Sequence, residues 1–448
     1  MSKYPIGEWR SSAVYDSAHE GNPFLAAMPE MLPHNSFMSA IRSLPPLPAG
    51  LGAMPSEERR RHLPMLSSLF VPMDYNYMLY DQLFRAIVST YSTRTMLEEV
   101  ERTNALFRGA PFSSYSTQPA TGSILGVPGV GKTSSIRRSL SLLPQVVEHE
   151  KYQGAPFFCK QILYLIVECP SDCSVKTLGL NIAVAIDKAI GSNYTKQLTT
   201  LRSAAASAIA TQVKILCLTH HVGLILIDEI QNAVTTARKN KQIKPLIKFL
   251  VELTNDTCTS AFFVGTPIAE ELFISQEHLK RRTRGMRLLP FKPDGSYRAF
   301  LQAIWPYQLT PATAPLTEQL ANKLYDASGG IPAYIIHIFQ ETQAQALLQG
   351  ERSISVKTML RAINVLAIKV PRTFSGGTHI SDFAVPSEAG PLSMEDSAPL
   401  PPVKRLYANK RGRKTVQRDD VDLTMGSQSV TPLADWLRER GRLEDWPC

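Results

Sequence analysis

The run Gly126-Val-Pro-Gly-Val-Gly-Lys-Thr133 constrains the fold of this chain more than any other stretch. It continues a short apolar run that begins at Ser123, and a helical stretch, SSIRRSLSLL, follows it. A glycine-rich loop between a strand and a helix lets backbone N–H groups surround phosphate oxygens, and the helix start adds the positive end of its dipole. The pattern therefore predicts a phosphate-binding loop within an α/β fold.

The loop also predicts which side chains meet the nucleotide and its metal. Lys132 would reach the β and γ phosphates, and Thr133 would ligate Mg²⁺. ATP and Mg²⁺ are therefore the predicted cofactors, with Thr133 and Asp228 as the predicted metal ligands. The residues predicted to bind the nucleotide are Gly126, Val127, Pro128, Gly129, Val130, Gly131, Lys132, Thr133, Ser134 and Asp228.

A second motif, Leu224-Ile-Leu-Ile-Asp-Glu229, ends four apolar residues with two acids. A buried parallel strand delivers such acids at its carboxyl end, where ligands bind in open α/β sheets. We expect Asp228 to hold Mg²⁺ through water and Glu229 to act as the general base on the attacking water. Two adjacent acids can also mark an ordinary turn, but the phosphate-binding loop favours the catalytic interpretation.

Five short apolar runs alternate with helical patterns, which predicts a doubly wound parallel sheet. The runs cover residues 123–127, 162–169, 223–227, 261–265 and 286–291. Thr266 follows the fourth run, so we predict that it senses the γ-phosphate or the attacking water. The alternative is that Thr266 only caps the helix expected to begin at PIAEELF.

Composition divides the chain into four predicted regions. Residues 1–72 are rich in Pro and Met and predict an extended, partner-binding N-terminal arm, and residues 73–292 form the α/β core with its leading helices. Residues 293–370 show only helical patterns and predict a small helical lid. Residues 371–448 predict a flexible, basic, Pro-rich tail whose last segment binds a partner.

The overall charge favours a polyanionic partner. The chain has 48 Lys and Arg against 39 Asp and Glu, a net charge of +9. No apolar stretch is long enough to span a membrane and no signal-peptide pattern begins the chain, so we expect a cytoplasmic protein. A zinc site built from Cys169, Cys173, His220 and His221 is disfavoured, because neither pair has the usual close spacing.

The stretch Leu279-Lys-Arg-Arg-Thr-Arg-Gly-Met-Arg287 carries five cationic side chains and no acid. Such a run is often just a solvated face, but it can also meet the phosphates of a nucleic acid or a nucleotide. Loop cations that could contact DNA are Arg238, Lys239, Lys241 and Lys244. Phosphate contacts of this kind supply affinity and salt dependence rather than sequence preference.

Together these motifs resemble the AAA+ ATPases and, within them, the TnsC and TniB transposition regulators of bacteria. The finer likeness lies in Ile227-Asp-Glu-Ile-Gln-Asn232, Val264-Gly-Thr-Pro-Ile-Ala269, the arginines that follow, and Gly21-Asn-Pro-Phe-Leu-Ala-Ala-Met-Pro29. The resemblance implies Arg281 and Arg282 as arginine-finger candidates that reach the ATP of a neighbouring subunit. The lid turn SGGIPAY departs from many relatives because it lacks their second-sensor arginine.

The resemblance also implies partners. It implies an ATPase that assembles on duplex DNA as a homo-oligomeric ring or helical filament, with hydrolysis driving disassembly. The N-terminal arm would face a TniQ- or TnsD-like target selector, and the tail would face a transposase of the TnsA/TnsB or TniA type. Trp436, Leu437 and Trp446 are plausible tail anchors, although an inert tail is the alternative.

Two other functions remain open on the sequence. One is an origin-recognition, helicase-loader or signalling ATPase with a similar helical lid. Such proteins often carry a winged helix or a sensor domain after the lid, whereas a Pro-rich tail follows here. The other is a nucleotide-gated scaffold that binds ATP without turnover, which an ATPase assay with DNA present would distinguish.

Overall fold

The computed structural model describes residues 7, 9–19, 21–92, 94, 104–105, 108, 119–200, 205–233, 243–270, 285–368 and 370. Residues 1–377 form one unit, and the second unit, residues 378–448, lies outside the described residues. Three groups of predicted residues also lie outside them: Arg281 and Arg282, the loop cations Arg238, Lys239 and Lys241, and the tail tryptophans. The structure therefore concerns the nucleotide site, the lid and most of the N-terminal segment.

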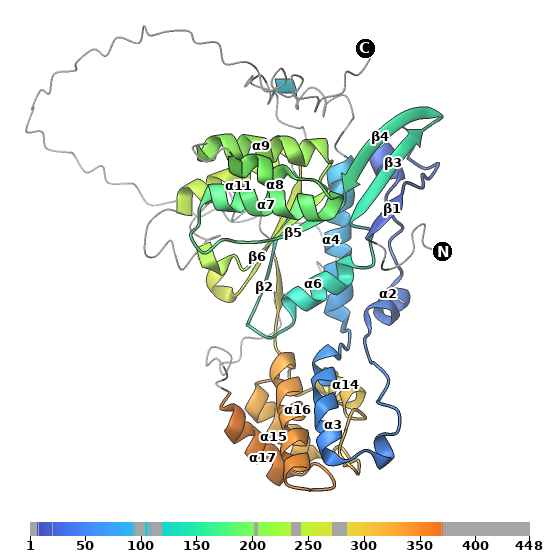
Figure 1. Cartoon of the computed structure of the whole chain (residues 1–448), viewed down its shortest axis with the longest axis vertical. Helices are drawn as coiled ribbons and strands as arrows, with labels where there is room; N and C mark the ends of the chain where they lie inside the picture. Colours follow the sequence, from blue (N-terminus) through green and yellow to red (C-terminus); the bar gives the residue numbers. More distant parts are fainter. Residues whose placement is uncertain are drawn as a thin grey trace, which may run out of the picture. The chain divides into compact units, whose positions relative to one another are not determined.

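A five-stranded parallel sheet forms the centre of the described chain (Figure 1). Its order is β5-β6-β7-β2-β8, and every neighbouring pair is parallel. The strands are β2 (Thr121–Gly126), β5 (Tyr164–Glu168), β6 (Leu224–Asp228), β7 (Ser260–Gly265) and β8 (Met286–Leu288). The predicted doubly wound sheet is confirmed. The loop after β2 and the acids after β6 both lie at the carboxyl edge, with β7 between their strands.

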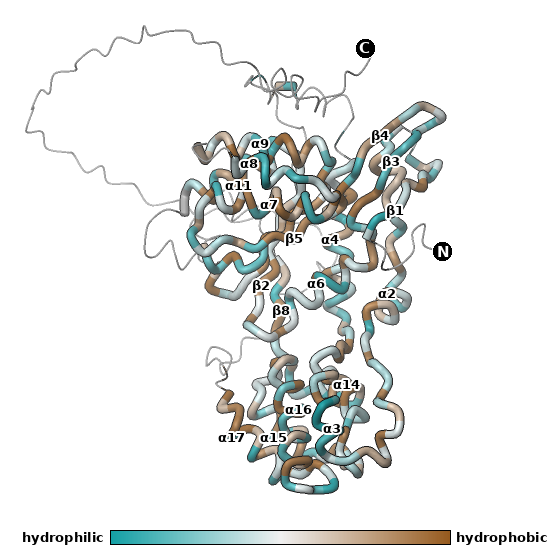
Figure 2. Tube along the Cα trace, in the orientation of Figure 1, coloured by the Kyte–Doolittle hydropathy of each residue, from teal (hydrophilic) through white to brown (hydrophobic). Residues whose placement is uncertain are grey.

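Helices cover both faces of this sheet because successive residues of each buried strand point to opposite sides. Ile225 and Ile227 of β6 face one core, with residues of α7 (Val175–Ile190), α9 (Ala206–Thr219) and α11 (Ile243–Thr257). Leu224 and Leu226 face the other, with residues of α4 (Asp74–Ser92) and α6 (Lys132–Leu140). Figure 2 shows the resulting hydrophobic colour along the central strands.

A second, three-stranded sheet was not predicted. It joins β1 (Arg10–Ser12), β3 (Val146–Tyr152) and β4 (Ala155–Ile162) in the order β1-β3-β4. Gln153 and Gly154 form the two-residue turn between β3 and β4, with φ of +48° and +83°. Two positive φ angles suit the turn type that follows strand twist, so Gly154 was an available hairpin signal. The predicted run 162–169 consequently divides, since Ile162 ends β4 and β5 begins at Tyr164.

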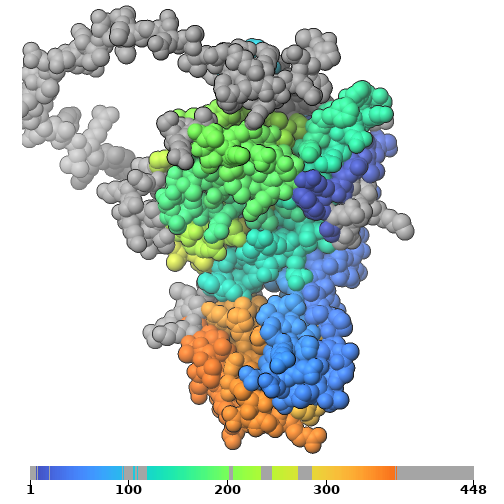
Figure 3. Space-filling model, viewed as in Figure 1, coloured from blue at the N-terminus to red at the C-terminus, as the bar shows by residue number. Residues whose placement is uncertain are grey.

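The described part of the predicted N-terminal arm packs on its own chain. It comprises β1, α1 (Pro23–Ala26), α2 (His34–Ile41), η1 (Leu51–Ala53), α3 (Ser56–His62) and η2 (Leu63–Ser68). Phe24 and Phe37 are buried beside α4, whereas Leu63 and Leu66 are buried among the lid residues. Figure 3 shows the blue N-terminal residues covering part of the orange helices. Part of the segment's hydrophobic surface is therefore buried within this chain, while Trp9, Val14 and Leu47 stay exposed.

The predicted lid consists of four helices around one core. They are α14 (Gly295–Ile304), α15 (Glu318–Ser328), α16 (Pro332–Leu348) and α17 (Val356–Leu366), with Trp305, Phe339 and Met359 buried among them. Gly329 ends α15 in the left-handed conformation, and Pro332 starts α16. This is the helix end and helix start that the turn Ser328–Pro332 predicts. No helix among the described residues is long and apolar enough to cross a membrane.

Candidate nucleotide-binding site

The predicted phosphate-binding loop has the conformation that phosphate binding requires. Gly129 and Gly131 adopt φ of +82° and +97°, and α6 begins at Lys132 directly after Gly131. Gly126 lies so close to β8 that a Cβ would come within 2.6 Å of the Leu288 carbonyl oxygen. The glycines therefore serve the loop's curvature and its packing, and the first turn of α6 faces the space above the loop.

Lys132 turns back onto the loop that carries it. Its ammonium group donates to the carbonyl oxygens of Gly126 at 2.8 Å and Val127 at 3.1 Å. Burial lowers the pKa of Lys132, while the nearby carboxylates of Glu229 and Asp228 oppose that shift. The cation is thus held at the loop by acceptors that a nucleotide phosphate would replace.

Thr133 and Asp228 meet across the sheet edge, as the sequence predicts for two residues that share a metal. The Thr133 hydroxyl donates to Asp228 Oδ2 at 2.9 Å. Hydroxyl and carboxylate oxygens are hard ligands of the kind that Mg²⁺ prefers. The residues present therefore fit Mg²⁺ bound with a nucleotide, and Thr133 and Asp228 would hold it. Mg²⁺ would supply charge neutralisation at the phosphates.

Glu229 extends beyond the strand end and is exposed. Its φ is +56°, a conformation that non-glycine residues adopt rarely, and its N–H donates to Asp228 Oδ1 at 2.9 Å. Unusual backbone angles of this kind gather at functional sites, where surrounding structure maintains them. The turn directs the two neighbouring acids differently: Asp228 contacts Thr133, and Glu229 is available to a solvent molecule.

Thr266 follows β7 at the same edge of the sheet. Its hydroxyl makes no capping bond to η3 (Pro267–Ala269), which disfavours the helix-cap alternative. The Thr266 Oγ1 atom is buried and, among the described residues, has no hydrogen-bond partner. A buried hydroxyl without a partner is costly unless a ligand completes it. This observation supports the sensor prediction, which remains a prediction.

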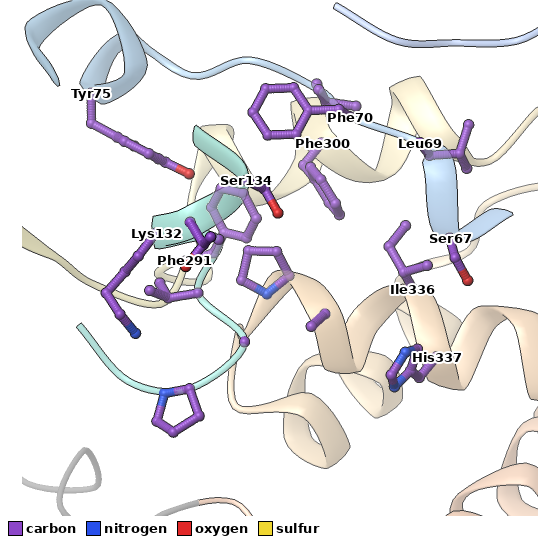
Figure 4. Close-up of a pocket in the computed structure, with 18 of the residues that line it drawn as sticks. Ser67, Leu69, Phe70, Tyr75, Lys132, Ser134, Phe291, Phe300, Ile336 and His337 are labelled. Carbon is purple, nitrogen blue, oxygen red and sulfur yellow. The ribbon is translucent and has the colours of Figure 1, made fainter. Parts of the chain in front are cut away.

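A cavity of about 400 Å³ opens between the phosphate-binding loop, the N-terminal segment and the lid. Figure 4 shows Lys132 on one side of it and Phe70, Phe300 and Ile336 on the other. A cavity of this size suits a small molecule with an apolar part and a charged part. The largely apolar wall was not predicted from the sequence, because the residues that form it come from segments that are distant in the chain. They are Leu69, Phe70, Val71, Tyr75, Phe291, Phe300, Ile336 and His337.

The lid approaches the loop through its backbone. The Ala333 N–H, in the first turn of α16, donates to the Gly129 carbonyl oxygen at 3.1 Å. A Cβ at Gly129 would lie 3.1 Å from both Ala333 Cβ and Ile331 Cγ2. Among the described residues that line the cavity, Lys132 is the only lysine or arginine. The lid lacks the second-sensor arginine of many relatives, and it supplies no other arginine or lysine among the described residues that line the cavity.

Residues 116–273 match the family model described as an AAA domain. The match contains the phosphate-binding loop, both acids and Thr266. The match assigns an AAA domain to these residues. Its core has the AAA+ P-loop fold, in which the loop strand β2 lies between β7 and β8.

Three solved structures illustrate the similarity, and this chain spans less than two thirds of the length of the first of them. The Aeropyrum pernix ORC1 protein in complex with DNA is 13% identical, with 60% of this chain and 64% of that chain covered and a TM-score of 0.39. Drosophila ORC bound to DNA is 13% identical over 75% of this chain and 74% of that one, with a TM-score of 0.41. The Thermotoga maritima RuvB branch migration motor is 14% identical over 61% and 70%, with a TM-score of 0.31. A comparison with curated proteins finds no match.

Proposed function

We propose that this ATPase is a transposition regulator of the TnsC/TniB type, which assembles on duplex DNA while ATP is bound. The proposal combines the resemblance of its sequence motifs with one structural observation. The cavity presents a single lysine or arginine, Lys132, among its described lining residues. In phosphoryl transfer, an arginine commonly adds to the lysine and Mg²⁺ that stabilise the charge of the transition state.

The missing positive charge is proposed to come from a neighbouring subunit. Arg281 and Arg282 are the candidates, as the last strand, β8, begins shortly after them at Met286. An arginine suits this position because its forked guanidinium stays charged and matches phosphate oxygens. Assembly would then depend on bound ATP, because the contact between subunits includes the γ-phosphate and weakens after hydrolysis.

We also propose where the adenine ring of the nucleotide binds in the cavity. The apolar wall of Phe70, Phe300 and Ile336 would contact the adenine ring, while Lys132 and the loop hold the phosphates. The same wall joins the N-terminal segment to the lid. Nucleotide binding would therefore fasten the lid to the N-terminal segment, the region that the proposed target selector is expected to contact.

The decisive experiment is electron microscopy of the full chain with duplex DNA and a slowly hydrolysed ATP analogue. Rings or filaments on DNA are expected with the analogue, and none with ADP. The Arg281→Ala/Arg282→Ala double variant should bind nucleotide but assemble poorly. Monomers alone in the presence of DNA and analogue would contradict the proposal.

A second assay separates this role from that of a helicase loader. A purified TniA-type transposase and TniQ-type target selector should co-sediment with the DNA-bound assembly, and the tail deletion 371–448 should lose the transposase alone. Assembly on DNA with no binding to either protein would leave the ATPase assignment intact and reject the transposition role.

A further inference from the structure

One side chain near the active site, Gln231, links the acid after β6 to the end of β7. Its amide N–H donates to Glu229 Oε2, and its amide oxygen accepts the Thr266 N–H at 3.1 Å. Gln231 lies two residues after the predicted base and 35 before the predicted sensor. Gln231 belongs to the run Ile227–Asn232, but the sequence alone assigns it no role.

The orientation of this amide follows from the chemistry of its partners. A backbone N–H can only donate, so the oxygen of Gln231 must face Thr266. An ionised carboxylate can only accept, so the amide nitrogen must face Glu229. Of the side chains of this length, only glutamine satisfies both partners: glutamate would oppose Glu229 with a second negative charge, and methionine would offer neither bond.

The surrounding backbone is shaped to admit this side chain. A Cβ at Gly265, the last residue of β7, would lie 2.6 Å from Gln231 Oε1 and 2.8 Å from Ile230 Cγ2. The Ile230 N–H also donates to the Val264 carbonyl oxygen at 3.0 Å, which holds the turn against the end of β7. Glycine at 265 therefore leaves room for the amide, and the turn after β6 and the end of β7 form one connected unit.

We propose that Gln231 is a positioning residue that sets the carboxylate of Glu229 for hydrolysis and couples it to Thr266. The amide holds one carboxylate oxygen and leaves the other for the attacking water. Thr266 carries both the N–H that Gln231 accepts and the buried hydroxyl without a partner. A hydrogen bond from that hydroxyl to a phosphate would move the Thr266 N–H with it, and Gln231 would transmit the change to Glu229.

The inference rests on the proposed roles of Glu229 and Thr266, and the test keeps the two separate. The Gln231→Met variant of the full chain keeps the side chain's length and loses both hydrogen bonds. We expect kcat for ATP to fall about 10- to 100-fold, the range typical of lost supporting bonds, with KM changed less than about threefold. Asn232→Ala is the matched control, because Asn232 lies in the same turn and its amide donates to the Cys169 carbonyl oxygen instead.

A second variant, Gln231→Glu, tests the mechanism rather than the fold. It keeps an acceptor for Thr266 but puts a carboxylate against Glu229, beside Asp228 and Lys132. This carboxylate cannot donate to Glu229, so kcat should fall as in Gln231→Met, with KM for ATP changed less than about threefold. A merely structural glutamine would not confine the loss to kcat.

The outcomes are distinct. Wild-type kcat in Gln231→Met, or an equal loss in Asn232→Ala, would overturn the positioning role even if Glu229→Gln is inactive. Wild-type turnover in Glu229→Gln would instead remove the proposed base and, with it, the premise of this inference. A loss of kcat at nearly constant KM in both Gln231→Met and Gln231→Glu would support the coupling.

Discussion

The two walls of the nucleotide cavity differ in the chemistry that they offer. On the sheet side, Lys132, Thr133 and Glu229 line the cavity, while Asp228 ends β6 and Thr266 follows β7 at the same edge. The lid and the N-terminal segment present mostly apolar side chains, with the polar Ser67, Tyr75 and His337 among them. The charged groups therefore lie on the sheet side of the cavity, and the opposite wall is mostly apolar.

The largest effect is expected on the sheet side, at Glu229, the proposed general base. Glu229→Gln should lower kcat about 10²- to 10⁴-fold, since the amide cannot take a proton, while ATP binding and DNA-bound oligomers persist. Steady-state turnover and filter binding measure the two effects. Glu168→Gln is the matched control, because Glu168 ends the neighbouring strand opposite Asp228 and is exposed. A similar loss in Glu168→Gln would mean that edge charge, rather than a base, is required.

The stability of the lid depends on a buried arginine, Arg59, which does not line the cavity. Arg59 is 2% exposed and donates to the carbonyl oxygens of Met54, Gly52 and Leu309. Arg59→Ala should destabilise the lid by about 3 kcal/mol, because three buried acceptors lose a charged donor. Thermal unfolding and hydrogen exchange of the lid would measure this. Its neighbour Arg60 is exposed, so Arg60→Ala should change stability by less than about 0.5 kcal/mol.

The folding stability of the region where Tyr15 of the N-terminal segment contacts His149 is predicted to depend on pH. His149 Nε2 donates to Gln161 Oε1 at 2.9 Å, so its Nδ1 accepts the Tyr15 hydroxyl at 2.7 Å in the neutral ring. Burial lowers the pKa of His149 from 6.5 to about 4.

Because the folded-state pKa is below that of the unfolded chain, the unfolded chain takes up the proton first. Stability present above pH 6.5 should therefore be lost as pH falls from about 6.5 toward 4, by about 2 to 3 kcal/mol from this residue. Denaturant unfolding across that range measures it. His149→Gln should flatten the dependence, and an unchanged slope would contradict the assignment.

The smallest effect is expected at the exposed edge of the apolar wall. His337 lines the cavity from α16. His337→Ala should raise KM for ATP about 3- to 10-fold with little change in kcat, since it removes binding that substrate and transition state share. Lys323→Ala, an exposed lid position outside the cavity, should leave both unchanged. A lower kcat with constant KM would place His337 among the groups that act on the phosphates.

The positions of the phosphate-binding loop and the two acids at one edge of the sheet could be predicted because their spacing is local. A glycine-rich loop between a strand and a helix, and two acids after four apolar residues, have few alternative structures. The same holds for the lid helices, whose 3.6-residue periodicity is read within each segment. The β3–β4 hairpin was missed because its only strong signal is Gln153-Gly154, and its strands are only partly buried.

The sequence by itself determined the ATPase motifs, the parallel sheet and the helical lid, because each follows from neighbouring residues and backbone geometry. Only the tertiary structure placed Phe70 and Ile336 on one wall, buried Arg59 against Leu309, and joined Gln231 to Thr266. These contacts connect residues between 35 and about 270 positions apart, and no periodicity or motif encodes which distant side chains share a space. They depend on packing, which the whole fold decides.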